Sequence, residues 1–200
     1  QMDTDPGFWD IYRQGIDLPH ADWAKIAYGA SRIFPQNYIS IKGACSEIVK
    51  QWYQKRINKN SVLVPDRLVR LEPGWNELPF VQVDVGKWIE QNQQIAKDFN
   101  IELLDMFVWE VKVASWQSQN QSEWDVFQEV FSPFNTRPLL EIMLGASSDL
   151  RQLERPILFE RIIEYMWADL LKYDLNPISF RKRLKTKIQS WLVLRGLYFR

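Results

Sequence analysis

The stretch from Ile101 to Gly145 decides the fold of this chain: IELLDMFVWEVKVASWQSQNQSEWDVFQEVFSPFNTRPLLEIMLG. Its first part places apolar residues on almost every side of a helix with about 3.6 residues per turn. These residues are Leu103, Leu104, Met106, Phe107, Val108, Val111, Val113 and Ala114. A helix that is apolar on most of its surface is normally buried. The pattern therefore predicts that this segment is the central helix of the protein.

The rest of this stretch predicts three further elements. Residues 117 to 122 are polar and predict a loop, after which a shorter helix is expected from Glu123 to about Val130. The sequence Ser-Pro-Phe-Asn at 132–135 predicts a turn. A helix is then expected from about Thr136 to Leu144, with Gly145 ending it.

Glu110 interrupts the apolar pattern of the predicted central helix. Its neighbours three and four residues away are all apolar: Met106, Phe107, Val113 and Ala114. An unpaired buried charge is costly, so Glu110 is expected either to lie beside a cation or to face a pocket. Arg137 is the nearest candidate cation in the sequence, and a structural ion pair between the two is the alternative to a functional role.

Lys112 belongs to a second stripe on the same predicted helix. The stripe is polar and aromatic, and consists of Glu102, Asp105, Trp109, Lys112 and Trp116. It could line a cleft, or it could be an exposed face with half-buried tryptophans. The sequence alone leaves both interpretations open.

The composition predicts one helical domain over residues 1–200, because the length suits a single domain and 46% of the residues are hydrophobic. The net charge of zero argues against binding to nucleic acid or to a membrane through overall charge. A single cysteine excludes an intrachain disulfide and fits a cytoplasmic location. Ten tryptophans, eleven phenylalanines and seven tyrosines suggest a large pocket or a partner surface.

Outside the central stretch, the pattern predicts one short strand, Tyr38–Lys42, and several helices. The expected helices cover residues 8–13, 21–34, 45–56, 65–71, 85–99 (with Asp84 as the N-cap) and 157–171, and a last helix carries the basic residues 181–187. The fold class is therefore mainly α, a helical bundle of about seven to eight helices. A lone strand is not stable, so this one is expected to pair, for example within a larger α/β sheet.

The strand is followed by Gly43 and then by a predicted helix. This geometry directs helix N–H groups toward an anion, so the loop 43–47 is a candidate anion-binding segment. An ordinary strand-to-helix turn is the alternative. The basic residues 181–187 have two similar interpretations, a solvated face or a phosphate-binding face.

Three segments together resemble the C-terminal part of asparagine-synthase-like proteins, a branch of the ATP-pyrophosphatase superfamily. The first is Ile41-Lys42-Gly43-Ala44-Cys45-Ser46-Glu47-Ile48 with Trp52-Tyr53, the second is Leu104-Asp105-Met106-Phe107-Val108-Trp109-Glu110 with Trp116, and the third is Ser132-Pro133-Phe134-Asn135-Thr136-Arg137-Pro138-Leu139-Leu140 with Trp167 and Asn176-Pro177. The resemblance covers most of residues 8–178.

The resemblance implies an ATP-dependent, amide-forming ligase. A substrate carboxylate would attack ATP to give an acyl-adenylate, an amine would capture it, and Mg²⁺ would assist. The residues it implies are Gly43, Ser46 and Glu47 on the cofactor side (Glu47 also as a metal ligand), Glu110 and Lys112 as catalytic residues, and Asn135 and Arg137 as residues that buttress the site.

The sequence also departs from this family. Only Glu47 remains of the family's acidic pair, with Ser46 before it. No two glycines are adjacent, so the phosphate-binding Ser-Gly-Gly-x-Asp-Ser loop is absent. The chain by itself is therefore not expected to bind ATP or to be active, and whether it is an enzyme stays open.

Two expectations about partners follow. If the resemblance holds, an N-terminal nucleotide-binding half or a protein partner supplies the phosphate loop, and the Gln1-Met2 start favours a segment of a longer protein. The alternative is a non-catalytic helical module that binds a protein partner through a Trp-rich surface. Such a surface could also form a homodimer. No nucleic acid and no membrane is expected as a partner.

Overall fold

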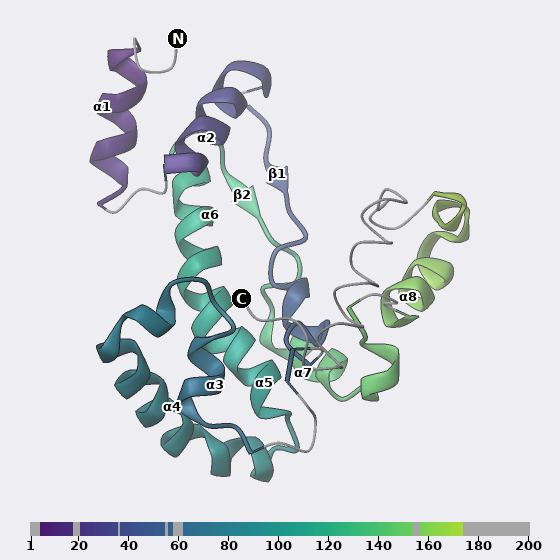
Figure 1. Ribbon diagram of the computed structural model, residues 1–200. Helices are drawn as coiled ribbons and strands as arrows, with labels where there is room; N and C mark the ends of the chain where they lie inside the picture. The colour runs from purple at the N-terminus through teal and green to yellow at the C-terminus, as the bar shows by residue number, and fades with distance from the viewer. Residues whose placement is uncertain are drawn as a thin grey trace, which may run out of the picture. The chain divides into compact units, whose positions relative to one another are not determined.

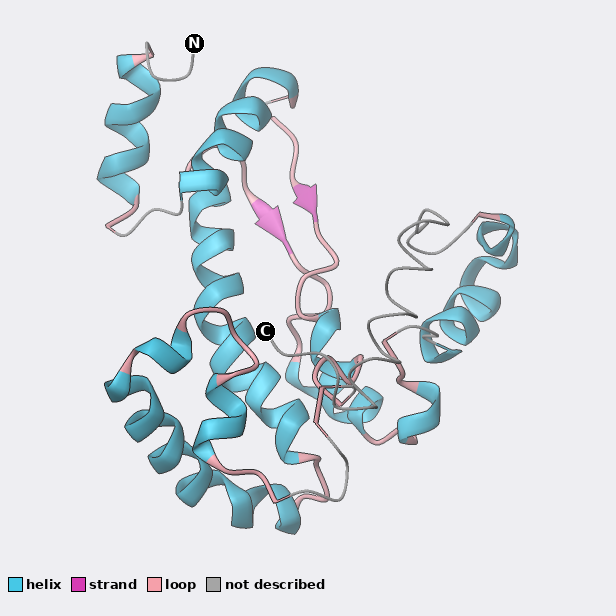
Figure 2. Cartoon of the chain, in the orientation of Figure 1, coloured by secondary structure: helices cyan, strands magenta, loops and turns pink. Residues whose placement is uncertain are grey.

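A computed structural model describes residues 5–17, 21–35, 37–54, 56–57, 62–153 and 157–173 (Figures 1 and 2). The described part is mainly helical, with one small sheet, which confirms the predicted fold class. The chain divides into two compact units, Gln1–Ile157 and Leu158–Arg200, and each is described by itself. The predictions for Asn176-Pro177 and for residues 181–187 lie outside the described residues.

The central helix of the first unit is longer than predicted. Helix α5 (Leu103–Phe107), the π-helix η4 (Val108–Gln117) and helix α6 (Ser118–Asp125) follow one another without a break. The predicted loop at 117–122 is therefore wrong, and so is the helix at 123–130. The polar segment is helical because its polar side chains find partners in neighbouring elements, which a hydrophobic pattern does not reveal.

The sheet consists of β1 (Ser40–Ile41) and β2 (Val130–Phe131), which pair in parallel (Figure 2). Ser40 lies opposite Val130 and Ile41 opposite Phe131. Backbone hydrogen bonds of 2.9 Å run from the Ser40 N–H to the Glu129 carbonyl and from the Lys42 N–H to the Phe131 carbonyl. The predicted strand 38–42 thus forms at its centre, and its partner lies within the same chain.

The two faces and the two edges of this sheet differ. Ser40 and Val130 are half-buried, whereas Ile41 and Phe131 on the other face are 73% and 56% exposed. At the outer edge of β2, the Asp125 carboxylate accepts the Val130 N–H at 3.0 Å, and the Gln121 amide donates to the Val130 carbonyl at 3.3 Å. Two side chains of α6 therefore satisfy this edge.

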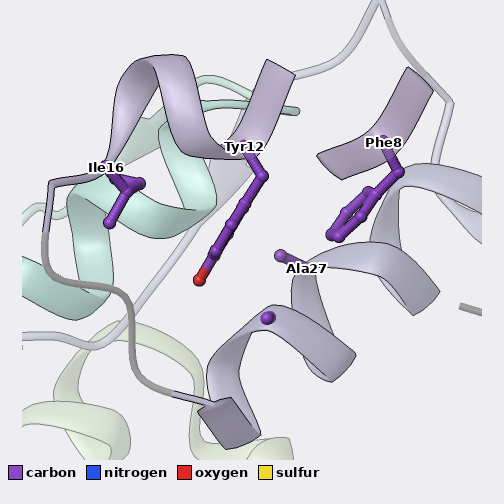
Figure 3. Packing of buried hydrophobic residues seen from close by; sticks show 5 residues of the cluster. Phe8, Tyr12, Ile16 and Ala27 are labelled. Atoms are coloured by element: carbon purple, nitrogen blue, oxygen red, sulfur yellow. The ribbon is translucent and has the colours of Figure 1, made fainter. Parts of the chain in front are cut away.

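Helices α1 (Pro6–Gly15) and α2 (Ala21–Ile33) form at the two predicted N-terminal sites. They share a cluster of buried apolar side chains, which Figure 3 shows from close by: Phe8, Tyr12, Ile16, Ala24 and Ala27. The Tyr12 hydroxyl donates a 2.6 Å hydrogen bond to the buried Glu123 carboxylate of α6. This bond fixes α1 to the central helix.

The segment after β1 differs from its prediction. A single 3₁₀ turn, η2 (Ser46–Val49), replaces the helix expected over residues 45–56. The helical path ends because Gln51 adopts a left-handed backbone with φ of +48°. The chain then turns, and both Val49 and Tyr53 are fully buried.

Helix α3 (Pro65–Val69) confirms the predicted short helix, and the 3₁₀ turn η3 (Trp75–Glu77) follows it. Helix α4 (Pro79–Asp98) begins before the predicted N-cap Asp84. Leu78 is extended and Pro79 supplies the first helical turn, a position that suits proline because no N–H bond is lost there. Asp84 instead pairs with Lys87 at 3.3 Å on the exposed surface.

Helix α7 (Arg137–Leu144) forms as predicted after the turn at 132–135, and it packs on η2. After it and the 3₁₀ turn η5 (Ser148–Leu150), Arg151 returns to the core. There its guanidinium pairs with the buried Asp105 carboxylate at 2.6 Å, and Gln54 donates to the same carboxylate at 2.8 Å. This buried pair ties the C-terminal end of the first unit to α5.

The described part of the second unit consists of α8 (Ile157–Trp167), which starts at the boundary residue, and the 3₁₀ segment η6 (Ala168–Lys172). The predicted helix is confirmed, but its apolar residues are not buried among the described residues. Tyr165 and Met166 are 93% and 78% exposed. Across the described residues, no helix is both long and apolar enough to cross a membrane.

Candidate functional site at the carboxyl ends of the strands

Two predicted loops follow the two strands. Residues 43–47 come after β1, and the turn 132–135 comes after β2. Because the strands are parallel and in register, both loops leave the same end of the sheet. The elements that follow, η2 and α7, also contact each other. Ligands of open α/β sheets bind at the carboxyl ends of the strands, so this end is the candidate site.

Two glutamines of the central helix hold these loops. Gln117 accepts the Cys45 N–H at 3.4 Å and donates to the Glu47 carboxylate at 3.5 Å. Gln121, four residues later, accepts the Ser132 hydroxyl at 3.3 Å. Sequence reasoning missed both glutamines because they fall in the predicted polar loop. Their spacing of four is the signal that could have placed them on one helix face.

The loop after β1 makes its sharp turn at Cys45. This residue has a left-handed backbone with φ of +70°, which costs a residue with a β-carbon roughly 1–2 kcal/mol. Gly43, which the sequence suggested for this loop, is exposed and lies before the turn. Burial raises the pKa of the Cys45 thiol, and the charge of Glu47 raises it further. Ser46, the next predicted site residue, is buried.

Lys112 lies one π-turn before Gln117 and therefore on the same face of η4. Its ammonium pairs with the Glu72 carboxylate at 2.7 Å. Three aromatic rings surround it, with centroids at 5.3, 5.5 and 5.7 Å: Trp52, Tyr53 and Trp116. The structure thus brings two predicted site residues, Lys112 and Glu47, to one side of the central helix.

The Lys112–Glu72 pair has a third member. The Tyr53 hydroxyl also donates to Glu72, so one carboxylate accepts from a phenol and an ammonium. Burial raises the pKa of Tyr53 well above its ordinary value, and the Glu72 carboxylate adds to this rise. Both charged side chains are only 19% exposed. This arrangement holds the Lys112 ammonium in one place.

The prediction for the packing of Glu110 is wrong. Glu110 is exposed and accepts a 3.0 Å hydrogen bond from the Trp88 indole. Arg137, its predicted partner, pairs instead with Glu141 at 2.7 Å. The physical reason is the π-helix, because its wider turn moves Glu110 away from the face that a 3.6-residue period assigns to it. Among the described residues, no hydrogen bond or ion pair joins Glu110 to either glutamine or to Lys112.

The other stripe residues also separate. Glu102 and Asp105 each accept a hydrogen bond from the Gln54 amide. Burial raises the pKa of the Asp105 carboxyl, against the attraction of the Arg151 guanidinium. The stripe predicted with an α-helical period thus belongs to two different clusters, of which only the one around Lys112 belongs to the candidate site.

Asn135 and Arg137 are exposed at the start of α7. The Asn135 N–H donates to the Ser132 carbonyl at 3.0 Å, which closes the turn after β2. The turn therefore places both residues at the carboxyl end of the sheet. Their predicted buttressing role stays a prediction.

The described residues contain no group of three or more His, Cys, Asp or Glu side chains placed to hold a metal ion. Mg²⁺ is often held by one or two carboxylates together with waters and substrate phosphates. A role for Glu47 as one such ligand therefore stays a prediction. Two open hollows line α4, and none of the predicted site residues lines either of them.

Comparison with protein-family models, with curated proteins and with solved structures finds no match to this chain.

Proposed function

We propose that this chain supplies the helical, substrate-side portion of an ATP-dependent, amide-forming enzyme of the asparagine-synthase-like kind. One observation carries the proposal. Two loops that are far apart in the sequence leave the carboxyl ends of two parallel strands, and one helix face holds both through Gln117 and Gln121. The same face carries Lys112.

The chemistry assigns a role to each group on this face. The held ammonium of Lys112 suits a substrate carboxylate, because a cation that is already in place stabilises an anion at little cost of reorganisation. The Gln117 amide keeps the strained Cys45 loop and Glu47 in place. The enzyme would join a carboxylate and an amine, with ATP cleaved to AMP and pyrophosphate.

On this proposal the chain does not supply the whole nucleotide site, because it has no pair of adjacent glycines to cradle phosphates. The proposal therefore assigns the phosphate-binding groups to another part of the enzyme. Glu47 is the carboxylate of this site that suits Mg²⁺, and it lies at the carboxyl end of β1.

The test is ATP–pyrophosphate exchange by the native protein isolated from its source, assayed with a panel of the twenty amino acids as the carboxylate. Exchange is expected, and Lys112→Met should lower its rate by about tenfold or more, the usual scale for a lost charged contact. Lys87→Met is the matched control, because Lys87 is exposed on α4. A native mass of 23.9 kDa together with no exchange would contradict the proposal.

A second candidate function is binding to a protein partner, and the sheet face favours it. Tyr38, Ile39, Ile41 and Phe131 are all more than half exposed and lie on or beside the two strands. Exposed apolar groups that adjoin one another mark interaction surfaces. Of the described tryptophans, by contrast, only Trp167 is more than half exposed, and Trp116 is 46% exposed. The apolar surface is therefore centred on the sheet rather than on tryptophans.

Sedimentation velocity of the native protein tests this second candidate. Ile41→Asp should shift the protein to a smaller species, because a charge on the sheet face would oppose the contact. Ile142→Asp is the control, since Ile142 is equally exposed on α7. Unchanged sedimentation with Ile41→Asp would count against it.

A further inference from the structure

Lys42 is a half-buried cation at the carboxyl end of β1. It follows the last strand residue directly, and its N–H still bonds to the Phe131 carbonyl. Its ammonium lies 3.7 Å from the centroid of the Trp124 ring of α6. A cation over an aromatic face gains some attraction, yet it gives up part of its hydration.

Lys42 differs from Lys112 in its charged partners. Lys112 pairs with Glu72 at 2.7 Å, whereas no carboxylate of the described residues lies within ion-pair distance of Lys42. Asp125 attracts it from farther away, while one oxygen of that carboxylate accepts the Val130 N–H. Burial lowers the pKa of Lys42 to about 8, and Asp125 opposes the change only partly. A partly buried ammonium of this kind is stabilised by an anion that comes close to it.

The backbone that follows Lys42 is exposed at Gly43. Gly43, the next residue, is exposed, and a β-carbon added there would meet no atom within 4 Å. An exposed residue of the loop 43–47, the loop that Gln117 holds, therefore follows Lys42 directly. This is the end of the sheet at which ligands of parallel sheets bind.

We propose that Lys42 binds an anionic oxygen of the ligand, from a phosphate or a carboxylate group, at the carboxyl end of the sheet, with the Trp124 ring supporting its ammonium. This inference rests on the proposed function only in its location. It adds a binding residue from β1 to a site that was assembled from the loops and from the central helix.

A footprint on the wild-type protein tests the proposal without any substitution. The chain is acetylated slowly with an amine-specific reagent, at constant ionic strength, with and without sodium pyrophosphate or sodium acetate, and the acetylated peptides are quantified by mass spectrometry. Pyrophosphate should slow acetylation of Lys42 by about threefold or more, because the bound anion holds the amine in its unreactive charged form. Lys87, exposed on α4, should react at the same rate with and without the anion.

The two anions distinguish a phosphate ligand from a carboxylate ligand. Protection by pyrophosphate assigns Lys42 to a phosphate group, and protection by acetate assigns it to a carboxylate. If neither anion changes the rate at Lys42 relative to Lys87, the proposal is overturned.

Calorimetric titration of pyrophosphate or acetate, whichever protects, into three variants gives an independent test. Lys42→Met should weaken binding by about tenfold or more, since a charge-assisted hydrogen bond is lost. Lys42→Arg should retain most of the affinity because it keeps the charge, and Lys87→Met should retain all of it. Wild-type affinity in a folded Lys42→Met variant would overturn the proposal. These measurements need no ATP, so a failed exchange assay and a failed Lys42 test are distinguishable.

Discussion

Val108 and Val113, the two buried residues of η4, stand five positions apart. An α-helix would bury residues three or four positions apart, whereas a π-helix places residues five apart on one face, because each N–H bonds to the carbonyl five residues before it. The same spacing places Lys112 and Gln117 on one face. The wide turn of this helix therefore determines which side chains meet the loops after the strands.

The π-helix predicts an unusual order of substitution effects. Val113→Ala should lower the free energy of unfolding by about 2 kcal/mol, because it removes buried methyl groups and leaves a cavity. Val111→Ala should cost clearly less, since Val111 is only half-buried. Urea unfolding of both variants measures the difference. An α-helical segment would give the reverse order, because Val111 would then share the face of Val108.

The buried pair of Asp105 and Arg151 predicts a pH-dependent defect. Arg151→Met should lower the free energy of unfolding by about 3–5 kcal/mol near neutral pH, because it leaves the Asp105 charge buried and unpaired. Burial raises the pKa of Asp105, and the loss of the guanidinium raises it further. At a pH below the unfolded value of about 3.9 the carboxyl is protonated in both states, and the penalty appears as pH rises from there through the folded pKa.

The measurement is urea unfolding of wild type and Arg151→Met at mildly acidic and at mildly alkaline pH. The defect should be smaller at the acidic pH. Arg70→Met, which breaks an exposed pair with Asp66, should change the free energy of unfolding far less than Arg151→Met at either pH, because solvent screens the exposed pair. A defect of Arg151→Met that grows on acidification would show that the carboxyl of Asp105 does not cause it.

The single cysteine reports on the loop that Gln117 holds. Cys45 is half-buried and burial raises its pKa, so its thiol should react slowly with a disulfide reagent at neutral pH. Gln117→Leu removes the bonds to the Cys45 N–H and to Glu47, and the reaction should become several-fold faster. Gln91→Leu, an exposed position on α4, should leave the rate unchanged. Equal rates for both variants would mean that Gln117 does not hold the loop.

Lys42 predicts a stability change at alkaline pH. Its folded pKa of about 8 lies below its ordinary value of 10.5, so the folded state binds fewer protons than the unfolded state between these values. The free energy of unfolding of wild type, relative to that of Lys42→Met, should therefore rise as pH increases from about 8 to 10.5. This gain in stability should be lost as pH falls back through the folded pKa.

Urea unfolding of wild type and Lys42→Met across this range provides the measurement. Asp125, whose charge opposes the fall in the pKa of Lys42, stays ionised throughout this range, because carboxylates titrate several units lower. A constant difference between the two proteins would show that burial does not shift the titration of Lys42.

The periodicity of apolar residues could predict most of the helices, and the positions of proline and glycine could predict some of their ends. The central helix, α2 and α7 follow from repeated apolar residues, and Pro138 with Gly145 frames the last of these. The start of α4 was missed because Pro79 looked like an interruption, although proline suits a first helical turn. The 3₁₀ turn after Cys45 was missed because a left-handed Gln51 cannot be inferred from residue type.

The candidate site was harder to predict than the fold. Lys112 and Glu47 do lie on one side of η4, but the residues that hold them, Gln117 and Gln121, belong to a segment without an apolar period. Glu110 was misplaced because a 3.6-residue period was applied to a π-helix. Nothing in the local sequence indicates the wider turn.

The outer edge of β2 is closed by side chains, so a further strand can join the small sheet only at its other edge. The outward N–H and carbonyl of Val130 are already hydrogen-bonded to Asp125 and Gln121. Another strand therefore has no free backbone groups of Val130 to pair with on that side. In a parallel ladder, alternate residues point to the same neighbour, and since Ser40 and Lys42 point to β2, the backbone groups of Ile41 point outward. Any third strand must therefore pair with β1. The strand β1 would then be the middle strand of the sheet, and β2 would remain an edge strand.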